Sequence, residues 1–101
     1  MPKLVRDKMP GIWNSAKKEF KIHTADDKEF DVALRAKIFQ EAQEAVDAQT
    51  KDKAISEMAT IIECVDEYLK LHKTTKEEFE NKRKEKNEKM GSFSKKTIVE
   101  D

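Results

Sequence analysis

The sequence predicts a small all-α protein, in which an antiparallel helix hairpin is extended to a small helical bundle that is completed by oligomerisation. Apolar residues recur at helical spacing from about residue 26 onward. The 101 residues include only two Gly and two Pro, too few turn residues for a β-sandwich or barrel. Charged residues make up 42% and hydrophobic ones 37%, which is typical of salt-bridged amphipathic helices around a modest core. This length predicts a single domain, residues 1–101.

The first helix of the predicted hairpin begins after a poorly patterned segment. Pro10-Gly11 predicts a turn or the start of a short helix, and no period is secure over residues 14–25. Asp26 or Asp27 can cap a helix that is expected to run to about Ala48. Its apolar residues share one face and are Leu34, Ile38, Ala45 and Ala48.

The second and third helices follow after short connections. Thr50 or Asp52 can cap the second, whose wide apolar arc predicts a central helix covered on more than one side. Because few residues separate the first two helices, they should form an antiparallel hairpin. The third helix opens with Thr75 and Glu78 at capping-box spacing and should end near Gly91. Its thin apolar content predicts that it is partly solvated or packs on a partner subunit.

Charge and cysteine content narrow the classes of partner and compartment. The 21 basic and 21 acidic residues balance, so neither nucleic acid nor an anionic membrane is expected as a partner. No apolar run approaches the roughly 18 residues of a membrane span, and the opening residues lack the apolar stretch of a signal peptide. A lone Cys64, set among apolar neighbours, is expected to be a buried structural thiol. A reducing, cytoplasmic location is the prediction.

The feature with chemical content is a group of glutamates on the predicted hairpin. Helical spacing places Glu41 within the apolar stripe of the first helix and Glu44 beside it, so both carboxylates can point into one pocket. Glu57 borders the apolar arc of the second helix, and the hairpin can bring it toward the other two. A carboxylate that faces a core normally needs a cation, a hydrogen-bond partner or a raised pKa.

Three converging carboxylates suit Mg²⁺ or Mn²⁺, which prefer oxygen ligands. Mg²⁺ is often completed by substrate phosphates, so such a site indicates phosphate-ester or phosphoanhydride chemistry. Another interpretation stays open: the glutamates pair with Lys37, Lys53 or Arg35 on a solvated face, since Glu-rich helices are common in a chain this charged.

Four blocks in order carry a resemblance to a known family. They are the opening Lys3-Leu4-Val5-Arg6-Asp7-Lys8-Met9-Pro10, residues 34–44 with an E-E-x-x-E-like pattern, residues 57–68 with an E-x-x-D-like pattern, and a closing block of residues 75–79 and 83–93 that ends in Gly91-Ser92-Phe93. Together they resemble the MazG-like nucleotide pyrophosphohydrolases, in particular the subgroup similar to phosphoribosyl-ATP pyrophosphohydrolase. The resemblance touches both ends and most of the chain.

The resemblance implies an all-α fold and Mg²⁺-dependent hydrolysis of nucleoside triphosphates between the α and β phosphates. The products would be the monophosphate and pyrophosphate, in a house-cleaning role against unwanted nucleotides. It also implies a homodimer or homotetramer. A catalytically degenerate relative, kept as a nucleotide-binding or helical oligomerisation module, is the alternative.

Carried over by position, the metal ligands and catalytic residues implied by the resemblance are Glu41, Glu44 and Glu57. Gln40 and Thr60 stand where the resembling family has acids. These neutral side chains should weaken Mg²⁺ binding or leave the ion dependent on substrate phosphates. A register in which Glu63 and Asp66 supply the second motif stays open. The Glu57 register is preferred because the apolar residues around it match the family pattern.

Four basic residues are candidates for contacts with substrate phosphates: Lys3, Arg6, Lys8 and Arg83. Asp7 is expected to orient Arg6 through a charge-assisted pair. The alternatives are that the first three tie the N-terminal segment to the hairpin and that Arg83 belongs to a solvated face. His72 has no partner at metal-ligand spacing and is interpreted as a surface residue.

Overall fold

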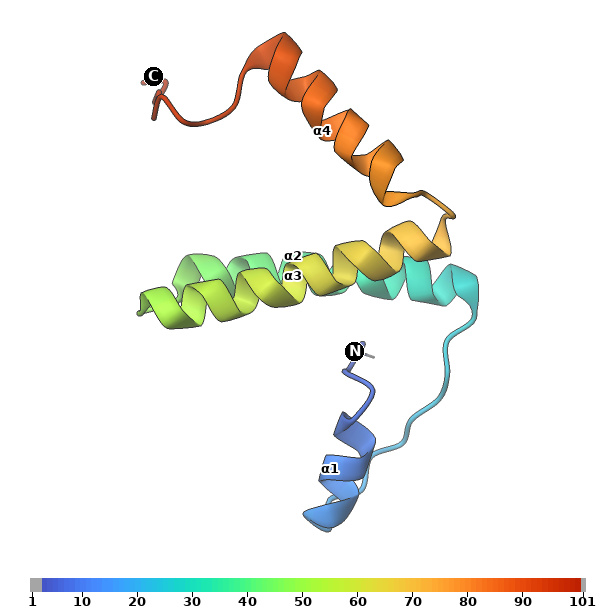
Figure 1. Ribbon diagram of the computed structural model, residues 1–101. Helices are drawn as coiled ribbons and strands as arrows, with labels where there is room; N and C mark the ends of the chain where they lie inside the picture. The colour runs from blue at the N-terminus through green and yellow to red at the C-terminus, as the bar shows by residue number, and fades with distance from the viewer. Residues whose placement is uncertain (1–2, 101) are drawn as a thin grey trace.

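The computed structural model describes residues 3–100, which form four α-helices and no strand. They are α1 (Met9–Ser15), α2 (Asp27–Asp47), α3 (Lys51–Leu71) and α4 (Lys76–Met90). The prediction of an all-α fold is confirmed. Helices α2 and α3 run antiparallel and side by side, whereas α1 and α4 are both connected to one end of this hairpin and lie on opposite sides of it (Figure 1).

Side-chain caps fix where the three longer helices begin. The Asp26 carboxylate accepts a hydrogen bond from the Glu29 amide at 2.8 Å, and the Thr50 hydroxyl accepts one from the Lys53 amide at 3.1 Å. Thr75 completes a capping box with Glu78 before α4. Each cap satisfies an amide that has no partner within the helix, so these boundaries follow from local sequence. Asp26, Thr50 and Thr75 are residues that the sequence proposed as caps.

The N-terminal helix α1 has Pro10 in its first turn, a position where the missing amide hydrogen costs nothing. The segment that follows turns back, and the ring of Phe20 packs on Trp13 with a centroid separation of 4.6 Å. This contact joins α1 to the segment over which no hydrophobic period was secure.

The core of the hairpin is small. Leu34 of α2 is 1% exposed and Cys64 of α3 is 7% exposed, and burial raises the pKa of the Cys64 thiol. The buried position of Cys64 agrees with the sequence prediction. Among residues 3–100, no helix is long and apolar enough to cross a membrane.

The prediction that the second helix is covered on more than one side is wrong for the single chain. Only α2 packs along α3 in the described part of the molecule. On the outer side of α3, Ile55, Met58 and Ile62 each expose more than half of their surface. The apolar arc of α3 is therefore wide, as predicted, but within the described chain only the side that faces α2 is covered by another helix.

Candidate metal site on the hairpin

The hairpin brings three carboxylates together in the half that lies next to the connection between α2 and α3. Glu41 and Glu44 lie one turn apart on α2, and Glu57 faces them from α3. One carboxylate oxygen from each lies within 4.8 Å of the others. Glu41 is 5% exposed and Glu57 9% exposed, whereas Glu44 is exposed. Two carboxylates of the cluster are therefore buried, and the third, Glu44, forms an edge that is open to solvent.

Each buried carboxylate also has a lysine four residues earlier on its own helix. Lys37 Nζ lies 3.1 Å from Glu41 Oε1, and Lys53 Nζ lies 3.2 Å from Glu57 Oε1. The pairing with Lys37 and Lys53 is the alternative that the sequence left open, although Arg35 pairs with Asp31 instead. Three carboxylates outnumber two ammonium groups, so one negative charge in the cluster is not balanced from within it.

The two buried carboxyls influence each other's protonation. Burial raises the pKa of Glu41, and its hydrogen bond with Glu57 raises it further, against the opposing effect of Lys37. The hydrogen bond with Glu41 and the one with Lys53 lower the pKa of Glu57. The two carboxyl groups therefore titrate as a pair, with burial opposed by the nearby lysines. A divalent cation bound between them would stabilise both groups in their ionised form.

The donor set and its spacing suit a hard divalent ion. Mg²⁺ binds oxygen ligands at about 2.0–2.1 Å, so ligands on opposite sides of the ion lie about 4.2 Å apart. Any two ligands of one ion lie no farther apart than this, and the three carboxylate oxygens already lie within 4.8 Å of one another. Glu44 and the open edge leave room for the waters that Mg²⁺ retains.

The two positions that depart from the family pattern lie on the same helices as the cluster, Gln40 directly before Glu41 and Thr60 one turn after Glu57. Gln40 and Thr60 are both half-buried, and the three clustered residues do not include Asp66 of the alternative register. The Thr60 hydroxyl accepts a hydrogen bond from Arg6 Nη2 at 3.0 Å. Arg6 is thus oriented by Thr60 and not by Asp7, because its guanidinium has no ion pair among residues 3–100.

In the described part of the chain, the structure shows no ion pair with the carboxylate cluster for the other three basic candidates, Lys3, Lys8 and Arg83. Lys3 and Lys8 are exposed, and Lys8 precedes α1 as its N-terminal flanking residue. Arg83 lies on α4, which does not pack along the hairpin, and pairs with Glu80 at 2.9 Å. Of the four basic residues proposed from sequence, the structure therefore brings Arg6 into contact with a hairpin helix next to the carboxylates.

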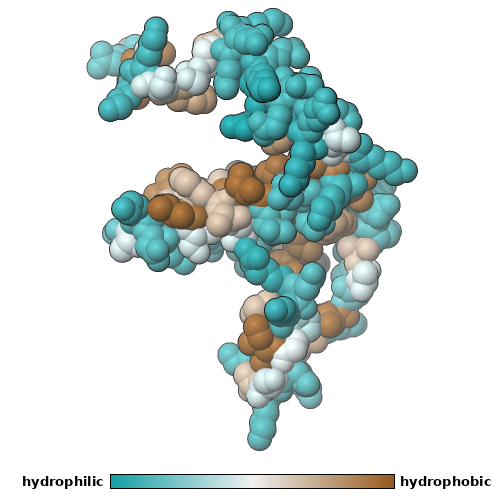
Figure 2. Space-filling model, in the orientation of Figure 1, coloured by the Kyte–Doolittle hydropathy of each residue, from teal (hydrophilic) through white to brown (hydrophobic). Residues whose placement is uncertain are grey.

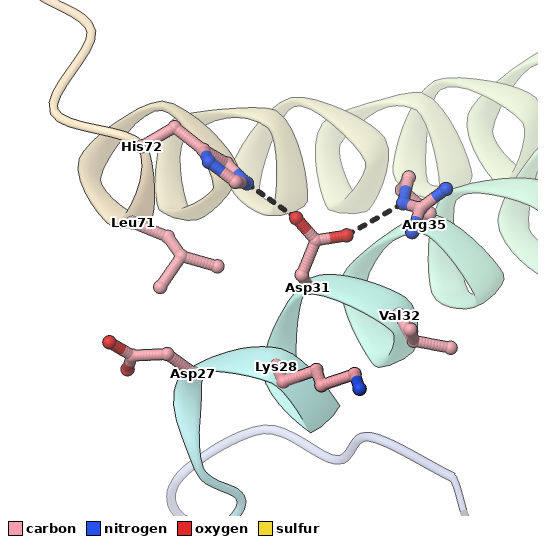
Figure 3. A pocket seen from close by; sticks show the side chains of 7 residues that line it. All are labelled: Asp27, Lys28, Asp31, Val32, Arg35, Leu71 and His72. Atoms are coloured by element: carbon pink, nitrogen blue, oxygen red, sulfur yellow. Dashed lines mark hydrogen bonds and ion pairs between the residues drawn. The ribbon is translucent and has the colours of Figure 1, made fainter.

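Sequence reasoning missed a second charged group at the open end of the hairpin. Asp31 of α2 accepts hydrogen bonds from Arg35 and from His72, which follows α3 (Figure 3). Burial of Asp31 raises its pKa, but the bonds from His72 and Arg35 outweigh that effect and lower it. His72 is exposed, as interpreted from sequence, yet it has a partner 41 residues earlier. This contact fastens the two helix ends together.

The candidate site is consequently the cluster of Glu41, Glu44 and Glu57, with Arg6 held beside it through Thr60. On helices with 3.6 residues per turn, Glu44 and Thr60 lie on one broad face of the hairpin, while Phe39 and Met58 lie on the other. The chain matches no family model, no curated protein and no solved structure.

Proposed function

We propose that this protein hydrolyses nucleoside triphosphates to the monophosphate and pyrophosphate, with one Mg²⁺ or Mn²⁺ ion bound by Glu41, Glu44 and Glu57. The observation that carries the proposal is the convergence of two buried carboxylates from adjacent helices, joined by a third at the open edge. The four sequence blocks that resemble MazG-like pyrophosphohydrolases support the choice of reaction. A reducing, cytoplasmic compartment, where nucleotides are abundant, suits such a role.

The lysine partners alone do not account for this arrangement. Lys–Glu pairs four residues apart form readily on a solvated helix surface, where they contribute only about 0.3–0.5 kcal/mol. Such pairs give no reason to place Glu41 and Glu57 against each other and away from water. Like charges at this separation repel each other, and each loses solvation by burial. A bound cation would offset both the repulsion between the carboxylates and their loss of solvation.

The chemistry divides between the ion and the side chains. When bound, the metal ion would neutralise phosphate charge and lower the pKa of a coordinated water. Glu41 and Glu57 would fix its position from the two helices, and Glu44 would complete the set from the exposed edge. Because the Glu44 side is open, the triphosphate would approach over this edge, on the face where Arg6 also lies.

Pyrophosphate release from a panel of nucleoside triphosphates is the direct test. We expect release with Mg²⁺ or Mn²⁺ and none in EDTA. Glu41→Gln should lower the rate about 100-fold or more, because loss of groups that merely support metal ligands already costs about 10–100-fold. Glu67→Gln, on the exposed Lys70 pair of the same hairpin, is the matched control. Activity that persists in EDTA, or that Glu41→Gln leaves unchanged, contradicts the proposal.

A second candidate is a non-catalytic relative that binds nucleotides or serves as a helical oligomerisation module. It is favoured by Lys37 and Lys53, which already bind oxygens of Glu41 and Glu57, and by the neutral residues Gln40 and Thr60. Such a protein would bind a triphosphate without consuming it. Turnover of any nucleoside triphosphate at about 1 per second, an ordinary enzymatic rate, eliminates this candidate.

We further propose that the active form is a homodimer or a homotetramer built from dimers. Apolar side chains gather on the hairpin in Figure 2, and five of them expose more than half of their surface: Phe39 and Val46 of α2, and Ile55, Met58 and Ile62 of α3. We name this the outer apolar face. A second copy of the hairpin would cover it and form a four-helix bundle with two-fold symmetry. The face lies opposite Glu44 and Thr60, so pairing would leave the cluster accessible.

Phe39→Glu should convert the dimer to a monomer, because it places a charge in the outer apolar face, which pairing must shield from water. Sedimentation velocity of the wild type and the variant at equal concentration measures the change. Ile98→Glu, which alters an apolar residue of similar exposure in the C-terminal tail, is the control and should remain dimeric. A wild type that sediments as a monomer would refute this part of the proposal.

A further inference from the structure

Thr60 stands where the family pattern has an acid, and its hydroxyl makes two defined hydrogen bonds. It lies one turn after Glu57 on α3, so the two side chains are neighbours on the helix surface. Its hydroxyl donates to the Ser56 carbonyl at 3.4 Å and accepts from Arg6 Nη2 at 3.0 Å. A hydroxyl has one hydrogen and two lone pairs, so both bonds form at the same time. The first bond sets the rotation of the hydroxyl, and the second locates Arg6.

Arg6 keeps its charge and most of its donors available in this arrangement. Its partner Thr60 is neutral, and none of the ion pairs among residues 3–100 involves Arg6. A guanidinium has five N–H groups, of which this bond uses one. The side chain is exposed, on a segment that lies 54 residues away in sequence from its partner. The result is a cation without an ion pair among residues 3–100, held against α3 one turn after Glu57.

We propose that Thr60 is a positioning residue that holds Arg6 at the edge of the Glu41–Glu44–Glu57 cluster, where the guanidinium binds the phosphates of the substrate. This inference rests on the proposed function and adds to it how the polyphosphate chain is bound, namely by the Arg6 guanidinium. A planar guanidinium matches two phosphate oxygens at once, whereas an ammonium group does not. Position 60 then supplies phosphate affinity through Arg6 in place of a further metal ligand.

The proposal reverses the expectation for restoring an acid at position 60. An aspartate there would form an ion pair with Arg6 and occupy two of its N–H groups. Thr60→Asp should therefore weaken the binding of a polyphosphate, although it adds a carboxylate near the metal. If position 60 were merely a lost ligand, the same substitution would strengthen binding.

The test uses inorganic triphosphate as the probe, with Mn²⁺, on the full chain, and measures its affinity by titration calorimetry. Thr60→Val removes the hydroxyl without changing the shape, and we expect it to weaken triphosphate binding about tenfold, in line with a bond to a charged group. Thr60→Ser keeps the hydroxyl and should stay within about twofold of the wild type. Arg6→Gln should lose at least as much as Thr60→Val, and the double variant should lose no more than Arg6→Gln alone.

Mn²⁺ binding without triphosphate, followed by electron paramagnetic resonance, distinguishes the metal site from the role of Thr60. We expect equal Mn²⁺ affinity in the wild type, Thr60→Val and Arg6→Gln. Two results would overturn the role of Thr60 while the metal site remains supported by intact Mn²⁺ binding. One is that the losses of triphosphate affinity in Thr60→Val and Arg6→Gln add in the double variant. The other is that Thr60→Asp binds triphosphate more tightly than the wild type. A wild type that binds no Mn²⁺ would overturn the metal site and this inference together.

Discussion

Saturating Mn²⁺ or Mg²⁺ should raise the midpoint of thermal unfolding of this protein by roughly 10–20 °C. An ion present at 100 times its dissociation constant stabilises the folded state by about 2.7 kcal/mol. Each kcal/mol shifts the midpoint of a domain of this size by about 4–8 °C. The effect is expected because Glu41 and Glu57 are buried together and come apart when the hairpin unfolds. Circular dichroism at 222 nm, in metal and in EDTA, measures the shift.

The same measurement on variants shows whether the shift comes from the cluster. Glu41→Gln keeps the size and shape of the side chain, so the helix should persist while the response to metal disappears. Glu67→Gln, whose carboxylate lies away from the cluster on the Lys70 pair, should respond like the wild type. An equal shift in all three proteins would mean that the ions act on the general surface charge and that the cluster is not their site.

Leu34→Ala should destabilise the fold by about 2–5 kcal/mol, the range measured for truncation of a fully buried leucine. Leu34 is 1% exposed, and only Cys64 joins it as a buried apolar residue in the described part of the chain. Small domains have total stabilities of about 5–15 kcal/mol, so this one change can remove much of the margin. Urea unfolding followed by circular dichroism, at a fixed protein concentration, gives the free energy.

Val99→Ala provides the contrast for that experiment. Val99 lies in the C-terminal tail, outside the helices, and is 87% exposed. Its truncation should change the free energy of unfolding by less than about 0.5 kcal/mol. Similar losses in both variants would show that the interface between α2 and α3 is not the main source of stability. Unfolding that depends on protein concentration would instead place much of the stability in contacts between copies.

Features of the fold with local causes could be predicted from the sequence. Asp26, Thr50 and Thr75 cap their helices through amides three residues ahead, and such contacts depend on neighbouring residues alone. The grouping of the three glutamates followed from two helical periods and a short connection. These parts of the structure are set within a few residues of sequence, so a pattern can reveal them.

Contacts between distant residues could not be predicted in this way. Periodicity showed that the second helix has a wide apolar arc, but it could not show that α2 covers only one side of it. The pairing of Arg6 with Thr60 and of Asp31 with His72 depends on how separate segments meet in space. Hydrophobic spacing carries no information on which polar side chain meets which, so Asp7 was expected where Thr60 is found.

The short connection between α2 and α3 has a consequence for how the protein is made. Three residues separate the helices, and tertiary contacts in the described chain are dominated by this neighbouring pair. Chains with such local topology fold in microseconds to milliseconds. Synthesis adds about 5–20 residues per second, so the hairpin can close as soon as α3 has left the ribosome. The carboxylate cluster would then form together with the hairpin, because it needs no contact with α1 or α4.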